Sequence, residues 1–255
     1  NLAGGVHDLV LSSEKRMELG ADINDAGQVV GVSGHDAGIK RAFLYHDSTG
    51  MTDLGPVPGR TTSFARGINE PGSVVGHSSG AGALAFVWRP GVGMTALQNI
   101  AGGATSEASE INDLGAIYGF AADAAGVKHA VMWTDPFAAP QRLDLSVVGH
   151  AGTEALDVNE SGYAVGYGLF EGQERALVFD PVLGARRLDT LIGPAATGWT
   201  FNRANGINEN GEIVGSGVFN GQTRAFMASP VPEPATALAF LAGTALLALR
   251  RKRRA

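Results

Sequence analysis

The chain has 255 residues, a formal net charge of −6 and no cysteine. The acidic excess disfavours nucleic acid as a partner, and the lack of cysteine excludes disulfides and Cys-ligated zinc within this sequence. A length of 255 residues with 37 glycines suits one all-β domain with many turns.

A nine-residue pattern occurs five times along the chain. It begins with an apolar residue, Asn and an acid. A Gly follows two positions after the acid, and the last three residues are an apolar pair and a second Gly. The copies occupy residues 23–31, 68–76, 111–119, 158–166 and 207–215. Their first residues lie 45, 43, 47 and 49 positions apart, which is the range of one blade of a β-propeller.

Each copy predicts a β-hairpin. Asn and Asp can bond nearby backbone and Gly supplies a positive φ, so the pattern favours a type I turn with a bulge. The closing glycine, such as Gly31, predicts a close approach by another part of the chain. Because an acid follows Asn in all five copies, we interpret it as a turn former rather than a catalytic group. These acids are Asp25, Glu70, Asp113, Glu160 and Glu209.

A third strand is predicted after each hairpin. Side chains alternate there with a two-residue period, and apolar residues occupy both faces, as expected for strands packed between neighbouring blades. The predicted strands are residues 41–45, 84–88, 129–133, 175–179 and 224–228.

The N-terminal segment predicts a strand that closes a ring. Leu9 lies 14 residues before Ile23, as Leu54 lies 14 before Ile68, whereas no such strand follows the last hairpin. A swapped N-terminal strand would complete the last blade and remove an open sheet edge. We therefore predict that residues 1–229 form a five-bladed β-propeller-like ring with four strands per blade; an open β-solenoid is the alternative.

The repeat resembles the HAF repeat of bacterial extracellular proteins. The resemblance rests on the hairpin pattern, strands such as Ala42-Phe43-Leu44-Tyr45, and endings such as Asp53-Leu54-Gly55, and it covers most of residues 7–228. The tripeptide His-Ala-Phe is nowhere complete, since Val131 follows His129 and Ala130. The resemblance implies an extracellular β-repeat fold and transfers no catalytic residues.

The composition changes at residue 230. The triplet Pro232-Glu233-Pro234 precedes fifteen uncharged residues, 235–249, and then the cations Arg250, Arg251, Lys252, Arg253 and Arg254. A fifteen-residue helix is ~22 Å long, shorter than a ~30 Å hydrocarbon core. The terminal cations nevertheless favour a short membrane span with a cytoplasmic C-terminus over a buried helix.

This tail, residues 230–255, is similar to the PEP-CTERM sorting signal. The resemblance implies a Gram-negative envelope, export, and an exosortase that removes the tail near the triplet, often alongside exopolysaccharide production. It makes Pro232, Glu233 and Pro234 the processing site and the cations 250–254 a transient inner-membrane anchor.

Candidate catalytic residues are few, and no cofactor or metal is expected. Acids directly precede three of the hairpins, at Asp22, Glu110 and Asp157, where two other repeats have Gly67 and Gly206. If the first strands line a tunnel, these carboxylates could converge to hold a cation or to hydrolyse a glycoside.

We expect a non-enzymatic exported, surface-associated or secreted protein that binds extracellular matrix or exopolysaccharide. Variable segments such as 33–36 and 77–80 predict binding loops, with His35 and His77 at the surface. The alternative is a secreted glycan-active hydrolase with the carboxylate site in the tunnel.

Overall fold

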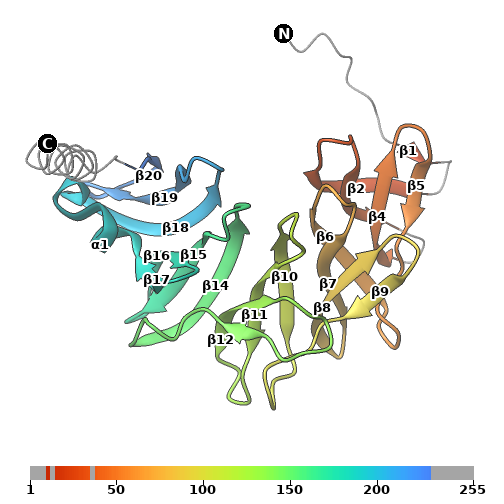
Figure 1. The fold of residues 1–255 in the computed structure, drawn as a ribbon, viewed down its shortest axis with the longest axis horizontal. Coiled ribbons are helices and arrows are strands. Elements are labelled where there is room, and N and C mark those ends of the chain that lie inside the picture. Colours follow the sequence, from red (N-terminus) through yellow and green to blue (C-terminus); the bar gives the residue numbers. More distant parts are fainter. Residues whose placement is uncertain (1–9, 12–14, 35–37, 231–255) are drawn as a thin grey trace, which may run out of the picture.

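Five antiparallel sheets, one for each repeat, form the fold of the computed structural model, which describes residues 10–11, 15–34 and 38–230. Figure 1 shows the sheets following one another around an open arc, with the first and last sheets at its opposite ends. The predicted all-β class and the five repeats are confirmed.

Strands that are neighbours in sequence are neighbours in each sheet. The sheets comprise, in chain order: β1 (Val10–Leu11), β2 (Lys15–Ile23), β3 (Val29–Gly34), β4 (Lys40–His46) and β5 (Gly50–Asp53); β6 (Thr62–Ile68), β7 (Val74–Gly80), β8 (Gly82–Arg89) and β9 (Gly93–Ala96); β10 (Ser106–Ile111), β11 (Ile117–Ala122), β12 (Lys128–Trp133) and β13 (Gln141–Arg142); β14 (His150–Val158), β15 (Ala164–Phe170), β16 (Gln173–Asp180) and β17 (Gly184–Arg187); β18 (Trp199–Ile207), β19 (Ile213–Phe219) and β20 (Gln222–Ala228). A short helix α1 (Leu188–Ile192) and a 3-10 turn η2 (Gly193–Ala196) precede the last sheet.

The turn of each repeat forms as predicted. Gly27 donates its N–H to the Asn24 carbonyl at 3.0 Å and has a φ of 78°, while the Asn24 side chain accepts the N–H of Gln28 at 3.0 Å. Asn therefore closes the turn through both its backbone and its side chain, and Gly supplies the left-handed residue.

The glycine that ends each repeat pattern faces a bulge in the first strand. At Gly76, an added Cβ would lie 1.9 Å from the carbonyl oxygen of Phe64, and the equivalent distance is 1.9–2.1 Å in all five copies. The register of β6 on β7 shifts between Ala65 and Gly67. The predicted close approach is confirmed, and the approaching atom is a backbone oxygen of the paired strand.

The acid after each Asn does not act within its own turn. Glu70 accepts the backbone N–H of Asp25 in the preceding sheet at 2.7 Å, and Asp113 accepts that of Glu70 at 2.8 Å. Glu160 and Glu209 continue the series at 3.0 Å. The interpretation of these acids as local turn formers is corrected, because Asn already satisfies the turn and the acids form a carboxylate ladder across all four sheet junctions.

Apolar residues between successive sheets form the core. Val30 and Ala42 of the first sheet pack with Ile68 and Phe86 of the second, which confirms the predicted packing of the third strands.

The outer faces of the terminal sheets differ from the internal ones. Ile23 is 62% exposed, whereas its repeat equivalent Ile68 is 5% exposed.

The structure does not show the predicted closure of the ring. Within the described residues, β1 pairs with β2 of its own sheet, and the last sheet has three strands, ending at β20. Pairing of β1 with β2 closes a connection of three residues, so it has a low entropic cost compared with pairing across the arc. Residues 8 and 9, the centre of the predicted closing strand, lie outside the described residues.

No helix in the described residues is long and apolar enough to cross a membrane. The predicted span 235–249, the triplet at 232–234 and the cations at 250–254 lie outside the described residues.

Candidate functional site

The structure places Asp22 and Asp157 at junctions between sheets. Asp22 accepts the N–H of its own neighbour Ile23 and that of Ile68 in the next sheet, both at 2.8 Å. Asp157 does the same with Val158 at 2.9 Å and Ile207 at 2.7 Å. Both oxygens of each carboxylate are therefore engaged by backbone, and each carboxylate links two successive first strands.

Glu110 occupies space that a glycine leaves open. Its Oε1 accepts the N–H of Ile111 at 3.0 Å, and a Cβ added to Gly67 would lie 2.2 Å from the same oxygen. A Cβ at Gly206 would lie 3.5 Å from Asp157 Oδ2, which is an ordinary van der Waals contact. Glycine at position 67 therefore makes room for the acid of the neighbouring sheet, whereas Asp157 alone does not require glycine at position 206.

The charges of Asp22 and Asp157 act on the Glu110 carboxyl. Burial, then the charges of Asp22 and Asp157, raise the pKa of Glu110 well above its usual range, although its bond from Ile111 opposes the shift. Burial also raises the pKa of Asp157. The three acids are therefore close enough for their charges to interact, and the structure gives Asp22 and Asp157 a role in joining sheets.

A cavity of about 480 Å³ lies beside Glu110, lined by the first strands of four sheets. Arg66 on β6, Glu107 on β10 and Glu154 on β14 contribute charged groups, and Phe120 contributes an apolar wall. Sequence reasoning missed Glu107 and Glu154. They share a repeat position that holds Leu19, Phe64 and Arg203 in the other sheets. The change of residue type at this one strand position was the feature of the sequence that could have identified them.

Burial and neighbouring charges shift the pKa of Glu107, which lines the cavity, and of Tyr167, which is adjacent to the lining residue Glu154. Burial raises the pKa of the Glu107 carboxyl, while Arg66 and Lys128 oppose the shift. Glu154 pairs with Lys128 at 2.5 Å. Burial and the adjacent Glu154 raise the pKa of Tyr167 to about 12. Of the two cavity carboxylates, Glu154 is therefore held by an ion pair with Lys128, and Glu107 has its pKa raised by burial.

The predicted binding loop at residues 77–80 is part of strand β7. His77 is 7% exposed and stacks on Phe64 with ring centroids 4.8 Å apart. Burial, then the charge of Arg66, lowers the pKa of His77 to about 4. The prediction of a surface His77 was wrong, because β7 extends to Gly80 and its first five residues, 74–78, are all buried. Ser33 of the other loop is also a buried strand residue, and His35 lies outside the described residues.

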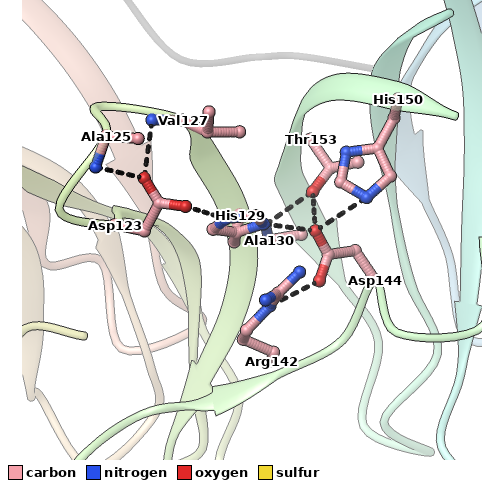
Figure 2. A network of polar contacts seen from close by, with 9 residues as sticks. All are labelled: Asp123, Ala125, Val127, His129, Ala130, Arg142, Asp144, His150 and Thr153. Carbon is pink, nitrogen blue, oxygen red and sulfur yellow. Dashed lines mark hydrogen bonds and ion pairs between the residues drawn. The ribbon is translucent and has the colours of Figure 1, made fainter. Parts of the chain in front are cut away.

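A second polar cluster lies between the third and fourth sheets. It contains His129 of β12, Asp144 after β13, and His150 at the start of β14. Asp144 is fully buried. Figure 2 shows both imidazole rings directed toward its carboxylate.

The fold and the sequence tail together define an exported all-β repeat protein. Residues 230–254 match the family described as the PEP-CTERM protein-sorting motif, which implies export and sorting by an exosortase. No curated protein matches the chain.

Proposed function

We propose that this protein is exported through its sorting motif, cut by an exosortase near Pro232, Glu233 and Pro234, and binds exopolysaccharide outside the cell without catalysing a reaction. The match of residues 230–254 to the sorting motif carries the proposal. The resemblance of the repeats to the HAF repeat supports the same extracellular location.

The tail is proposed to hold the protein transiently in the inner membrane. Residues 235–249 would form the short span, and the cations at 250–254 would keep the C-terminus in the cytoplasm. The mature protein would then be surface-associated or secreted.

The proposed carbohydrate site is the cavity on the inner strands. Carboxylates at Glu107 and Glu154 can accept hydrogen bonds from sugar hydroxyls, and Arg66 can donate them. Phe120 adds an apolar surface, over which Lys128 lies 3.9 Å from the ring centroid. A concave site with a few convergent polar groups on an apolar wall is the usual form of a small-ligand pocket.

A glycan-active hydrolase is the second candidate. The raised pKa of Glu107 favours it, since a protonated carboxyl is the form that a general acid needs. The hydrogen bonds of Asp22 and Asp157 argue against these two acids as a catalytic pair. Each carboxylate already accepts two backbone hydrogen bonds, which leaves less capacity to bind or protonate a substrate.

A glycan array combined with a hydrolysis assay on extracted exopolysaccharide separates the two functions. We expect binding without released sugar, and about tenfold weaker binding in Glu107→Gln, corresponding to one hydrogen bond of ~1.4 kcal/mol. Asp189→Asn is the control, because Asp189 lies outside the cavity. Turnover that is abolished by Glu107→Gln or Asp157→Asn would overturn the non-enzymatic proposal.

Mass spectrometry of the C-terminus tests the sorting step. We expect the mature protein to end near Glu233, and Glu233→Ala to accumulate in the membrane with its tail. An intact peptide reaching Arg254 in wild-type envelope fractions would contradict processing.

A further inference from the structure

The cluster between the third and fourth sheets presents three ligand-type side chains to one point. Asp144 Oδ2 lies 2.8 Å from His129 Nδ1 and 3.3 Å from His150 Nε2. All three ligand atoms lie within 4.8 Å of one another. Donor atoms around a tetrahedral zinc ion, each ~2.0–2.2 Å from the metal, are about 3.3–3.6 Å apart. Because no two of the three atoms are more than 4.8 Å apart, zinc binding would require them to approach by about 1.5 Å at most.

His129 faces a carboxylate on each side. Its Nε2 lies 3.1 Å from Asp123 Oδ2, opposite the contact with Asp144. A neutral imidazole carries one N–H, so only one of these contacts can be an ordinary hydrogen bond. If Asp123 accepts that proton, the lone pair of Nδ1 faces Asp144. This is the carboxylate–histidine–metal arrangement in which an outer carboxylate orients a ligating imidazole.

The remaining contacts also fit a ligand set. Arg142 donates to Asp144 Oδ1 at 3.0 Å and Thr153 donates to Oδ2 at 2.9 Å, which fixes the carboxylate. The His150 side chain is 10% exposed, and its Nδ1 is buried without a hydrogen-bond partner in the described residues. A buried imidazole nitrogen without a hydrogen-bond partner is costly, whereas the other nitrogen of this ring, Nε2, faces Asp144.

The fold itself does not require these residues. A hydroxyl links successive sheets at three junctions, where Ser63, Ser106 and Thr153 accept a backbone N–H at 2.8–3.1 Å. At the first junction, the hydroxyl of Ser63 donates to the Gly55 carbonyl at 2.6 Å, and no carboxylate is needed. Asp144 takes the place of Gly55 in the repeat. His129 and His150 accompany Asp144 at this junction. The cluster therefore adds ionisable residues to a kind of junction that the first two sheets build with a hydroxyl and a backbone carbonyl.

We propose that His129 Nδ1, Asp144 Oδ2 and His150 Nε2 form a site for a divalent transition-metal ion such as Zn²⁺. The ion joins the third and fourth sheets, and Asp123 orients His129 from outside the ligand set. Two imidazoles and one carboxylate are a donor set that zinc accepts, with the fourth position left for water.

Metal binding by the full chain, after removal of bound metal with a chelator, tests the site directly. We expect one equivalent of Co²⁺ to give the visible absorption of a tetrahedral complex. Zn²⁺ should displace it and raise the Tm by roughly 5–10 °C at a hundredfold excess over Kd. Asp123→Asn should weaken binding by about 10–100-fold, and His150→Gln should weaken it more.

Asp189→Asn is the matched control, because Asp189 is the repeat equivalent of Asp144 and pairs with Arg187 as Asp144 pairs with Arg142. Its metal affinity should equal that of the wild type. If Asp144→Asn fails to fold, His150→Gln with an unchanged circular dichroism spectrum provides the same test. Absence of Co²⁺ binding, or equal binding by His150→Gln and the wild type, would overturn the proposal and leave a hydrogen-bonded cluster.

Discussion

The carboxylate of Glu70 accepts the backbone N–H of Asp25, 45 residues earlier in the chain, at 2.7 Å. Three further acids make the same bond to the preceding sheet. The acid that follows Asn in the turn therefore joins two repeats. Its contribution to the free energy of unfolding can be measured at the junction of Glu70 with Asp25.

Removal of Glu70 should destabilise the protein. Glu70→Ala leaves the N–H of Asp25 without its acceptor, and the loss of one partly solvated hydrogen bond costs about 0.5–1.5 kcal/mol. Asp25→Ala is the control, because the carboxylate of Asp25 accepts no hydrogen bond in the described residues. Its effect should stay below about 0.5 kcal/mol. Urea unfolding measures both, and equal losses would argue against the ladder.

Gly76→Ala should destabilise far more than Gly20→Ala. An alanine at 76 would place Cβ 1.9 Å from a carbonyl oxygen, whereas nothing lies within 4 Å of a Cβ at Gly20. Such overpacking costs about 1–3 kcal/mol and occasionally more, while the change at Gly20 should cost less than about 0.5 kcal/mol. Thermal melting compares the two. A tolerated alanine at 76 would show that the bulge can relax.

Acid should weaken the fold through His77. Its folded-state pKa is about 4, below the ordinary 6.5, because burial and then Arg66 disfavour the charged ring; Glu107 lies 3.5 Å away, too far for a strong hydrogen bond. The unfolded chain binds the proton first, so stability is complete above pH 6.5 and falls toward pH 4. The slope approaches about 1.4 kcal/mol per pH unit. Denaturation at each pH should show a smaller slope for His77→Gln, and identical slopes would refute this origin.

Glu110→Gln should stabilise the protein at neutral pH. Burial and two nearby carboxylates raise the pKa of Glu110, so its ionised form is disfavoured in the fold. Glu110 contributes its full stabilisation of the folded state below pH 4.5, its pKa in the unfolded chain. This stabilisation is lost as the pH rises through the higher pKa that Glu110 has in the folded state. Glutamine keeps an acceptor for Ile111 without the charge. The gain should therefore disappear below pH 4.5 in unfolding experiments, and a loss of stability at pH 7 would contradict it.

Turn chemistry and the apolar packing of the third strands were predictable from sequence, and the polar contacts between repeats were not. Asn24, Gly27 and Gly31 were assigned correctly, because turns and strand crowding depend on residues nearby in the chain. The partner of Glu70 lies in another sheet, and turn statistics contain no information about it. His77 was misplaced because a polar strand facing a buried junction resembles a loop. The cluster of His129, Asp144 and His150 depends on how two sheets meet, which no spacing in the sequence reports.

The carboxylate ladder gives the arc a polarity. Each sheet offers a carboxylate toward one end of the molecule and an N–H toward the other, so every junction uses the same pair of complementary groups. Duplication of one repeat could lengthen such an array with the same carboxylate-to-N–H bond at the new junction. Loss of a repeat would bring the carboxylate of one neighbour to the N–H of the other. Variation in repeat number among descendants of this protein is therefore compatible with an unchanged set of internal bonds.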